Sequence, residues 1–248
     1  MRLYHEQHGT GEPLVMLHGG IGASETLVPL VPGFDRRVIL ADLQGHGRTP
    51  DADRPLRPAL MADDVAELAS ELGLEQIDLF GYSLGGEVAL RVAIQHPELV
   101  RRLVLVSISA RREGNHPEVL AAFDGLTEAA AEPMKASPAY AHYAQVAPRP
   151  EDWPVLIGKT GELLRHDYDW TDEIPGVQAR TLLVYADADS IRPDHVVEFY
   201  GLLGGGLGDP GWDGSHPGPQ LAILPGRTHY DVLGSPLLVP AVEAFLSS

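Results

Sequence analysis

Apolar runs alternate with amphipathic stretches along most of the chain. Residues 13–18 and 37–42 are mostly apolar, which is typical of strands buried on both faces. Residues 61–72 carry apolar side chains every three to four positions, which predicts an amphipathic helix that ends at Gly73. The alternation continues with strands expected at 77–81, 103–107, 181–186 and 221–224, and helices expected at 87–95, 194–203 and 238–246. The pattern predicts an α/β fold, in which helices cover both faces of a mostly parallel sheet.

The alternation breaks between residues 110 and 177, where the pattern is helical. Helices are expected there at 117–131, 138–146 and 153–165. Because this segment follows one strand and precedes the next, we expect it above the carboxyl ends of the strands, where α/β proteins bind ligands. We therefore predict a core of residues 1–109 and 178–248 and a helical cap of residues 110–177. The alternative is an elaborated crossover without a role at the site.

A second irregular stretch, residues 204–220, is rich in glycine and proline. It follows an expected helix and precedes an expected strand, which places it at the amino end of the sheet, away from the ligand-binding edge. We interpret it as a surface loop or contact element, in which Trp212 is the residue suited to anchor a partner.

Composition narrows the class of protein. The length of 248 residues suits one such domain, and the net charge of −17 disfavours a nucleic-acid partner. The chain has no cysteine, which excludes disulfides, thiolate catalysis and cysteine-based zinc sites, and its histidines show no metal-binding spacing. No stretch reaches the roughly 18 apolar residues of a membrane helix, and the first residues lack an apolar signal segment. We expect a soluble, cytoplasmic protein that has no membrane partner.

The sequence Gly81-Tyr82-Ser83-Leu84-Gly85-Gly86 lies between an expected strand and an expected helix. A strand that turns at once into a helix strains the residue at the apex and requires small residues two positions before and after it. Such a turn holds the apical hydroxyl at the carboxyl end of the strand, beside the helix N-terminus. We predict Ser83 as a nucleophile.

A serine nucleophile needs a base, and the base needs a carboxylate that orients it. His229 follows the expected strand 221–224, and both Asp187 and Asp189 follow the strand 181–186. The chain order of serine, aspartate and histidine is the order found around such a turn. We predict His229 as the base, with either aspartate as its partner.

Attack on a carbonyl also requires donors for the developing oxyanion, each worth on the order of 3 kcal/mol of barrier. The N–H group of Leu84, which follows the nucleophile, is one predicted donor. The glycine-rich loop after the first expected strand supplies the other, from Gly20 or alternatively Ile21. We expect His18 to hold this loop by hydrogen bonds rather than to take part in catalysis.

Five motifs together resemble the α/β-hydrolase fold superfamily, in its compact serine-hydrolase branch with a helical cap. They are LHGG at 17–20, DLQGHGRT at 42–49, GYSLGG at 81–86, ADADSIRP at 186–193 and GRTHY at 226–230. In such relatives the acid lies three residues after the small residue that ends its strand and four before a proline. Counted from Ala186 and from Pro193, the resemblance selects Asp189 and leaves Asp187 to accept hydrogen bonds from loop N–H groups.

The resemblance implies a serine hydrolase that cleaves a neutral carboxylic ester or lactone through an acyl-enzyme, without a metal or organic cofactor. C–C bond hydrolases and cofactor-free perhydrolases use the same triad and remain alternatives. A non-catalytic ligand-binding relative is the alternative of another class. Relatives that open epoxides or displace halide have aspartate where this chain has Ser83. Aromatic residues of the cap, foremost Tyr143 and Trp153, are expected to line a pocket for a small, uncharged, apolar or aromatic substrate. The alternative for any one of them is that it packs the cap against the core.

Overall fold

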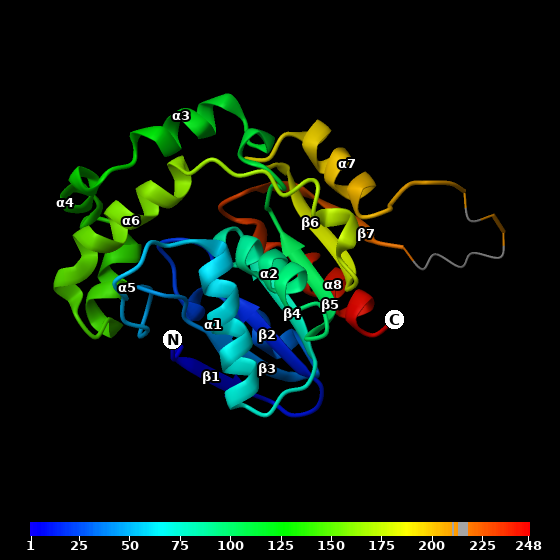
Figure 1. The fold of residues 1–248 in the computed structure, drawn as a ribbon, viewed down its shortest axis with the longest axis horizontal. Helices are drawn as coiled ribbons and strands as arrows, with labels where there is room; N and C mark the ends of the chain where they lie inside the picture. Colours follow the sequence, from blue (N-terminus) through cyan, green and yellow to red (C-terminus); the bar gives the residue numbers. More distant parts are fainter. Residues whose placement is uncertain (210, 213–217) are drawn as a thin grey trace.

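A seven-stranded sheet forms the centre of the protein (Figure 1). The computed structural model describes residues 1–209, 211–212 and 218–248. The strands are β1 (His5–His8), β2 (Pro13–Leu17), β3 (Arg37–Ala41), β4 (Ile77–Tyr82), β5 (Val100–Val106), β6 (Arg180–Ala188) and β7 (Gln220–Thr228). Their order is β1-β3-β2-β4-β5-β6-β7, and every described pair is parallel except β1 with β3. The mostly parallel sheet predicted from the sequence is confirmed.

Helices cover both faces of this sheet. One face packs against α1 (Pro58–Glu71), α2 (Leu84–Gln95) and α7 (Pro193–Leu202). The other face packs against the 3-10 helix η2 (Val28–Gly33) and against α8 (Leu238–Leu246). Successive residues of the central strands alternate between the two cores: Val15 of β2 lies in the first, and Met16 lies in the second. This two-sided burial is the reason that β2 and β3 read as continuous apolar runs.

A helical segment separates β5 from β6 and lies beyond the carboxyl ends of the strands (Figure 1). Its helices are α3 (Pro117–Gly125), α4 (Ala131–Met134), α5 (Pro138–Val146) and α6 (Trp153–Arg165). The remaining short 3-10 helices are η1 (Ser24–Thr26), η3 (Arg112–Gly114), η4 (Glu128–Ala130), η5 (Pro150–Asp152), η6 (Ile174–Gly176) and η7 (Val232–Gly234). The expected bounds of α5, α6 and α8 agree with the structure.

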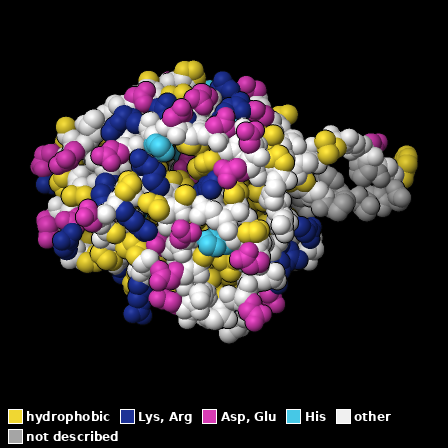
Figure 2. Space-filling view, in the orientation of Figure 1, with side chains coloured by type: hydrophobic (Ala, Val, Ile, Leu, Met, Phe, Trp, Pro, Cys, Tyr) yellow, Lys and Arg dark blue, Asp and Glu magenta, His cyan; other side chains and the backbone are white. Residues whose placement is uncertain are grey.

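The stretch 204–220 joins α7 to the amino end of β7, on the side predicted from the sequence. Its described part projects from the body of the protein (Figures 1 and 2), and the side chain of Trp212 is fully exposed. Residues 210 and 213–217 lie outside the described residues. The role of Trp212 as an anchor for a partner therefore stays a prediction.

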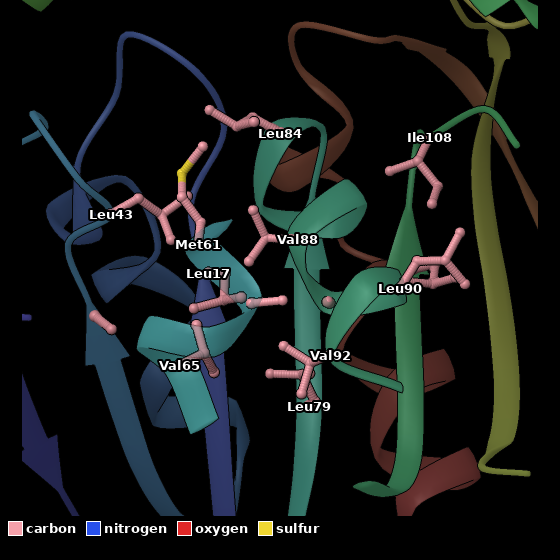
Figure 3. Packing of buried hydrophobic residues seen from close by; sticks show 14 of the residues in the cluster. Leu17, Leu43, Met61, Val65, Leu79, Leu84, Val88, Leu90, Val92 and Ile108 are labelled. Atoms are coloured by element: carbon pink, nitrogen blue, oxygen red, sulfur yellow. The ribbon is translucent and has the colours of Figure 1, made fainter. Parts of the chain in front are cut away.

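Figure 3 shows how α1 and α2 pack against the sheet. Met61 and Val65 of α1 meet Val88 of α2 and Leu17 of β2, and all four side chains are fully buried. Each such side chain contributes about 2 kcal/mol to stability through burial. α1 begins three residues earlier than its apolar pattern, because Pro58 is suited to the first turn of a helix, and it ends before Gly73, whose φ is 67°. The packing of α2 matters for the site because it fixes the direction in which this helix leaves β4.

Three expectations about local structure were wrong. The edge strand β1 was not predicted, because its residues are polar and an edge strand has no continuous buried face. The helix expected at 117–131 ends at Gly125, and the chain is extended at Leu126 and Thr127 before it turns again. The strand expected at 221–224 does not end there: β7 continues through Pro225 and Gly226 as an irregularity, in which Ala186 pairs with Leu224 and Ala188 with Thr228.

Candidate active site

Ser83 occupies the strained apex between β4 and α2. Its φ of 51° lies in the left-handed region, and its carbonyl accepts the N–H groups of Gly86 and Glu87 at 2.8 and 3.0 Å. A Cβ on Gly81 would lie 2.2 Å from the carbonyl oxygen of Gly85. A Cβ on Gly85 would lie 2.4 Å from the carbonyl oxygen of Leu17. Only glycine fits at these two positions, as the sequence pattern around the apex predicts.

Ser83, His229 and Asp189 form one hydrogen-bonded line. The Oγ of Ser83 lies 3.1 Å from Nε2 of His229, and Nδ1 of His229 lies 3.0 Å from Oδ1 of Asp189. The three residues sit at or just beyond the ends of β4, β7 and β6, so the parallel sheet brings together side chains that lie up to 146 positions apart. Ser190 Oγ also lies 2.8 Å from Nδ1 of His229, on the same side of the ring as the carboxylate.

Asp189 is buried but ionised. Its side chain is 2 % exposed, and its Oδ2 accepts the hydroxyl of Ser107 at 2.6 Å and the N–H of Ala186 at 3.0 Å. Burial raises the pKa of this carboxyl, but the hydrogen bonds and the charge of His229 outweigh burial and hold the net pKa below the usual range. A carboxylate that stays charged in this position can fix the tautomer of His229 and stabilise its protonated form.

Asp187 lies at the exposed irregularity of β7 and not at His229. Its Oδ1 accepts the N–H of Arg227 at 3.0 Å. The backbone N–H groups of Gly226 and Arg227 lower the pKa of Asp187. The structure thus brings Asp189 to His229 and gives Asp187 the loop contacts that the resemblance implies.

Two backbone N–H groups at the cavity that contains Ser83 have no acceptor among the described residues. Gly20 and Leu84 line the same cavity as Ser83, and among the hydrogen bonds of the described residues none uses either of their N–H groups. Leu84 is the first residue of α2, so its N–H has no acceptor within the helix. Ile21 also lines the cavity, with a strained φ of 60°. Free donors at a helix N-terminus and a strained loop are suited to stabilise negative charge.

His18 holds the loop that carries Gly20. Its Nε2 accepts the N–H of Leu43 at 3.0 Å, so the proton lies on Nδ1, which donates to the carbonyl of Gly19 at 2.8 Å. Complete burial lowers the pKa of His18 and keeps its ring neutral. Asp42 stabilises the segment that follows this loop, because its carboxylate accepts the N–H of Ser24 at 2.8 Å. These contacts agree with the structural role expected for His18.

The cavity beside Ser83 has a volume of about 240 Å³. Helices α3 and α6 supply an apolar part of its wall, from Val119, Phe123, Leu163 and Leu164. A polar part of the wall comes from Glu87, Ser109, Asn115 and Thr160. The sequence analysis missed this polar group, although one signal was available: Glu87 is an acidic residue in the otherwise largely apolar helix α2, one turn after Ser83.

Neither Tyr143 nor Trp153 lines this cavity, contrary to the expectation from the sequence. Trp153 is fully buried, and its Nε1 donates to the carbonyl of Ala131 at 2.9 Å. Its ring packs against Tyr140 and Tyr143, with centroids 5.3 and 5.2 Å away. Tyr143 borders a separate hollow, beside His142. The physical reason is that these large aromatic side chains pack into the hydrophobic core, in the same buried cluster as residues of α1 and α2.

The described residues contain no cluster of three or more metal-ligating side chains that could hold an ion. Of the described helices, none has the length and apolarity that a membrane crossing requires.

Comparison with known proteins agrees with this architecture. A family model described as the alpha/beta hydrolase fold matches residues 12–134. The crystal structure of E-2-(acetamidomethylene)succinate hydrolase superposes with a TM-score of 0.76 at 23% identity, over 99% of this chain and 95% of that chain. The chain therefore has the α/β-hydrolase fold.

Several relatives that match by sequence are named as lipases or hydrolases. The sn-1-specific diacylglycerol lipase ABHD11 of Xenopus laevis is 40% identical over 103 residues, which cover 40% of this chain and 33% of the lipase. The 2-hydroxymuconate semialdehyde hydrolase of Pseudomonas sp. is 40% identical over 104 residues, which cover 40% of this chain and 37% of that protein. The match thus spans about a third of the length of these relatives.

Proposed function

We propose that this protein is a serine hydrolase that cleaves a neutral carboxylic ester or lactone through an acyl-enzyme. The observation that carries the proposal is the series of hydrogen bonds from Ser83 Oγ through His229 to Asp189, at 3.1 and 3.0 Å, with Ser83 and His229 on the wall of a cavity. No metal or organic cofactor takes part in this chemistry.

The geometry supports a two-step reaction. As Ser83 Oγ attacks the substrate carbonyl, Nε2 of His229 accepts the hydroxyl proton, and Asp189 stabilises the imidazolium. The N–H groups of Leu84 and Gly20 stabilise the negative charge on the carbonyl oxygen. His229 then protonates the leaving alkoxide, and the acyl group stays on Ser83. A water molecule, deprotonated by His229, attacks the acyl-enzyme and releases the carboxylic acid.

The helical segment acts as a cap in this proposal, with residues 110–177 covering a core of residues 1–109 and 178–248. Its support is the shared cavity: Thr160 and Leu163 of α6 line the same hollow as Ser83. The apolar side chains of Val119 and Phe123 favour a small substrate with an apolar or aromatic body. In this proposal the cap therefore determines substrate specificity, and the residues at the carboxyl ends of the strands carry out the reaction.

The main alternative is a C–C bond hydrolase or a perhydrolase that uses the same triad. It draws support from the relative named for a semialdehyde rather than for an ester. The diacylglycerol lipase, named for an ester-bearing lipid, supports the ester instead. A non-catalytic ligand-binding protein is the alternative of another class.

Covalent labelling together with a substrate panel tests the proposal. The protein is treated with a fluorophosphonate and digested, and the labelled peptide is identified by mass spectrometry. Hydrolysis of p-nitrophenyl esters and lactones is measured in parallel. We expect a label on Ser83 and turnover of esters or lactones; Ser109→Ala, which changes another serine of the cavity, should still be labelled. A label without such turnover favours the C–C or perhydrolase alternative, and no label favours the ligand-binding protein.

A further inference from the structure

Glu87 places a carboxyl group in the cavity, and the proposed reaction does not use it. It lies one helical turn after Ser83 on α2, and its backbone N–H donates to the carbonyl of Ser83 at 3.0 Å. Side chains four positions apart in a helix point to the same side, and both residues line the cavity. The carboxyl therefore faces the space in which a substrate attached to Ser83 would lie.

A chain of hydrogen-bond donors ends on this carboxyl. The Nδ2 of Asn115 donates to Ser109 Oγ at 3.1 Å, and the hydroxyls of Ser109 and Tyr168 lie 2.8 Å apart. The hydroxyl of Tyr168 donates to Glu87 Oε1 at 3.2 Å, so the Ser109 hydroxyl donates to Tyr168. The ring of Tyr168 stacks on Trp170, with centroids 4.4 Å apart, which fixes its direction. Each hydrogen bond in this series is thus donated in the direction of Glu87.

The other carboxyl oxygen of Glu87 is available to a ligand. Among the described residues, no hydrogen bond uses Oε2 of Glu87, and no ion pair joins this carboxyl to a cation. The nearest basic residue along α2, Arg91, pairs instead with Glu173 at 2.7 Å. Burial raises the pKa of Glu87 to about 7, and the hydrogen bond from Tyr168 only partly offsets burial. No cation therefore compensates the charge that this buried carboxyl carries when it is ionised.

Thr160 adds a second polar group without a partner to the same cavity. It is 3 % exposed, and among the described residues its buried Oγ1 has no hydrogen-bond partner. Unsatisfied buried polar atoms are uncommon in folded proteins, and a ligand is one way to satisfy them. We call Glu87 and Thr160 the polar subsite.

We propose that the polar subsite binds a hydrogen-bond-donating group of the substrate, and an ammonium group most tightly. The inference rests on the proposed cleavage of an ester, and it replaces the neutral substrate by one that carries a donor group: an apolar body lies along Phe123 and Leu163, and the donor group meets Glu87. The net charge of −17 favours the approach of such a substrate, and acidic side chains are spread over the visible face (Figure 2).

Three matched esters test this inference. They are the p-nitrophenyl esters of 4-ethyl-, 4-(hydroxymethyl)- and 4-(aminomethyl)phenylacetic acid, which have nearly the same shape and differ in the group at one end. We expect kcat/KM at pH 8 to be highest for the aminomethyl ester, by about tenfold over the ethyl ester, because a charge-assisted hydrogen bond is the strongest contact available. The hydroxymethyl ester should lie between them.

Variants of Glu87 separate its charge from its hydrogen bond. Glu87→Gln should remove the advantage of the aminomethyl ester and keep part of that of the hydroxymethyl ester. Glu87→Leu should make the ethyl ester the best substrate. Glu173→Gln removes an exposed carboxylate near α2 and should leave the order of the three esters unchanged. An order that is the same in wild type and in both Glu87 variants, or a wild type that prefers the ethyl ester, overturns the inference.

Direct binding distinguishes failure of this inference from failure of the proposed function. If none of the three esters is hydrolysed, 4-ethyl- and 4-(aminomethyl)phenylacetamide are titrated into the Ser83→Ala variant by calorimetry. Tighter binding of the aminomethyl amide, lost in a Ser83→Ala, Glu87→Gln double variant, supports the polar subsite without any chemistry at Ser83. Equal binding of the two amides overturns it.

Discussion

The cavity has two walls that are held in different ways. At the sheet edge, Ser83, Asp189 and His229 lie at the ends of parallel strands, and backbone hydrogen bonds between the strands set their spacing. The other wall comes from α3 and α6, and α6 packs against α5 through the buried Trp153. Changes in the first wall should therefore alter the rate of the chemical step. Changes in the second should alter substrate choice or stability.

The largest effect on kcat is expected for Ser83, at the apex of the turn in the first wall. Ser83→Ala should lower kcat by more than about 10³-fold, because the triad acts as a unit above a residual effect of the oxyanion donors. The fold should persist, since His229 is the one hydrogen-bond partner of the Ser83 hydroxyl among the described residues. Steady-state kinetics and thermal unfolding measure both quantities. A variant that keeps a tenth of the wild-type kcat would show that another residue is the nucleophile.

The two aspartates at the end of β6, Asp187 and Asp189, give a matched pair. Asp189→Asn should lower kcat by about 10²–10⁴-fold, since it removes the charge beside His229 and can favour the wrong tautomer. Asp187→Asn should leave kcat nearly unchanged and act on stability, through the N–H of Arg227. Comparison of kcat and of the free energy of unfolding for the two variants checks this. The reverse pattern in kcat contradicts the assignment.

Two aromatic residues of the second wall sharpen the comparison. Phe123 lines the cavity, so Phe123→Ala should change kcat/KM unequally among substrates, by about 1–3 kcal/mol. Trp153 fills the core between the helices, so Trp153→Ala should cost about 3–5 kcal/mol of stability and slow all substrates alike. The ester panel and denaturant unfolding give the two readouts. Unequal substrate effects from Trp153→Ala would mean that the helical core itself shapes the pocket.

The smallest effect concerns the pH dependence of stability. Because burial raises the pKa of Glu87 from 4.5 to about 7, the native state keeps a proton that the unfolded chain releases at lower pH. Stability from this group is complete below about pH 4.5 and falls as the pH rises through 7. Glu87→Gln cannot ionise, so its stability relative to wild type should rise by up to about 3 kcal/mol between pH 4.5 and pH 8. Denaturant unfolding at both pH values measures the difference, and a constant difference contradicts the buried, unpaired carboxyl.

The first wall could be predicted from the sequence because its positions follow from local rules. Close backbone contacts at Gly81 and Gly85 require glycine, and the order of strands then places His229 beside the apex. The choice of Asp189 over Asp187 needed the resemblance to a family, because both carboxylates follow the same strand. The edge strand β1 escaped prediction because it buries no continuous apolar face.

The second wall could be predicted only in outline. The periodic pattern located α5 and α6, but periodicity does not tell whether an aromatic side chain faces a cavity or a neighbouring helix. Trp153 faces Tyr140 and Tyr143, and this depends on how separate helices pack. The polar subsite likewise joins Glu87 of α2 to Thr160 of α6, which only the folded chain brings to one cavity.

The acyl-enzyme itself gives the most direct test of the central claim, that the sheet edge holds a serine nucleophile. The protein is mixed with p-nitrophenyl trimethylacetate, whose crowded acyl group is chosen to slow the second step. The p-nitrophenolate burst is recorded, and the quenched protein is digested for mass spectrometry. The account predicts a burst of about one equivalent per protein and a trimethylacetyl group on Ser83, both absent from Ser83→Ala. An acyl group on any other residue, or the same burst from the variant, contradicts it.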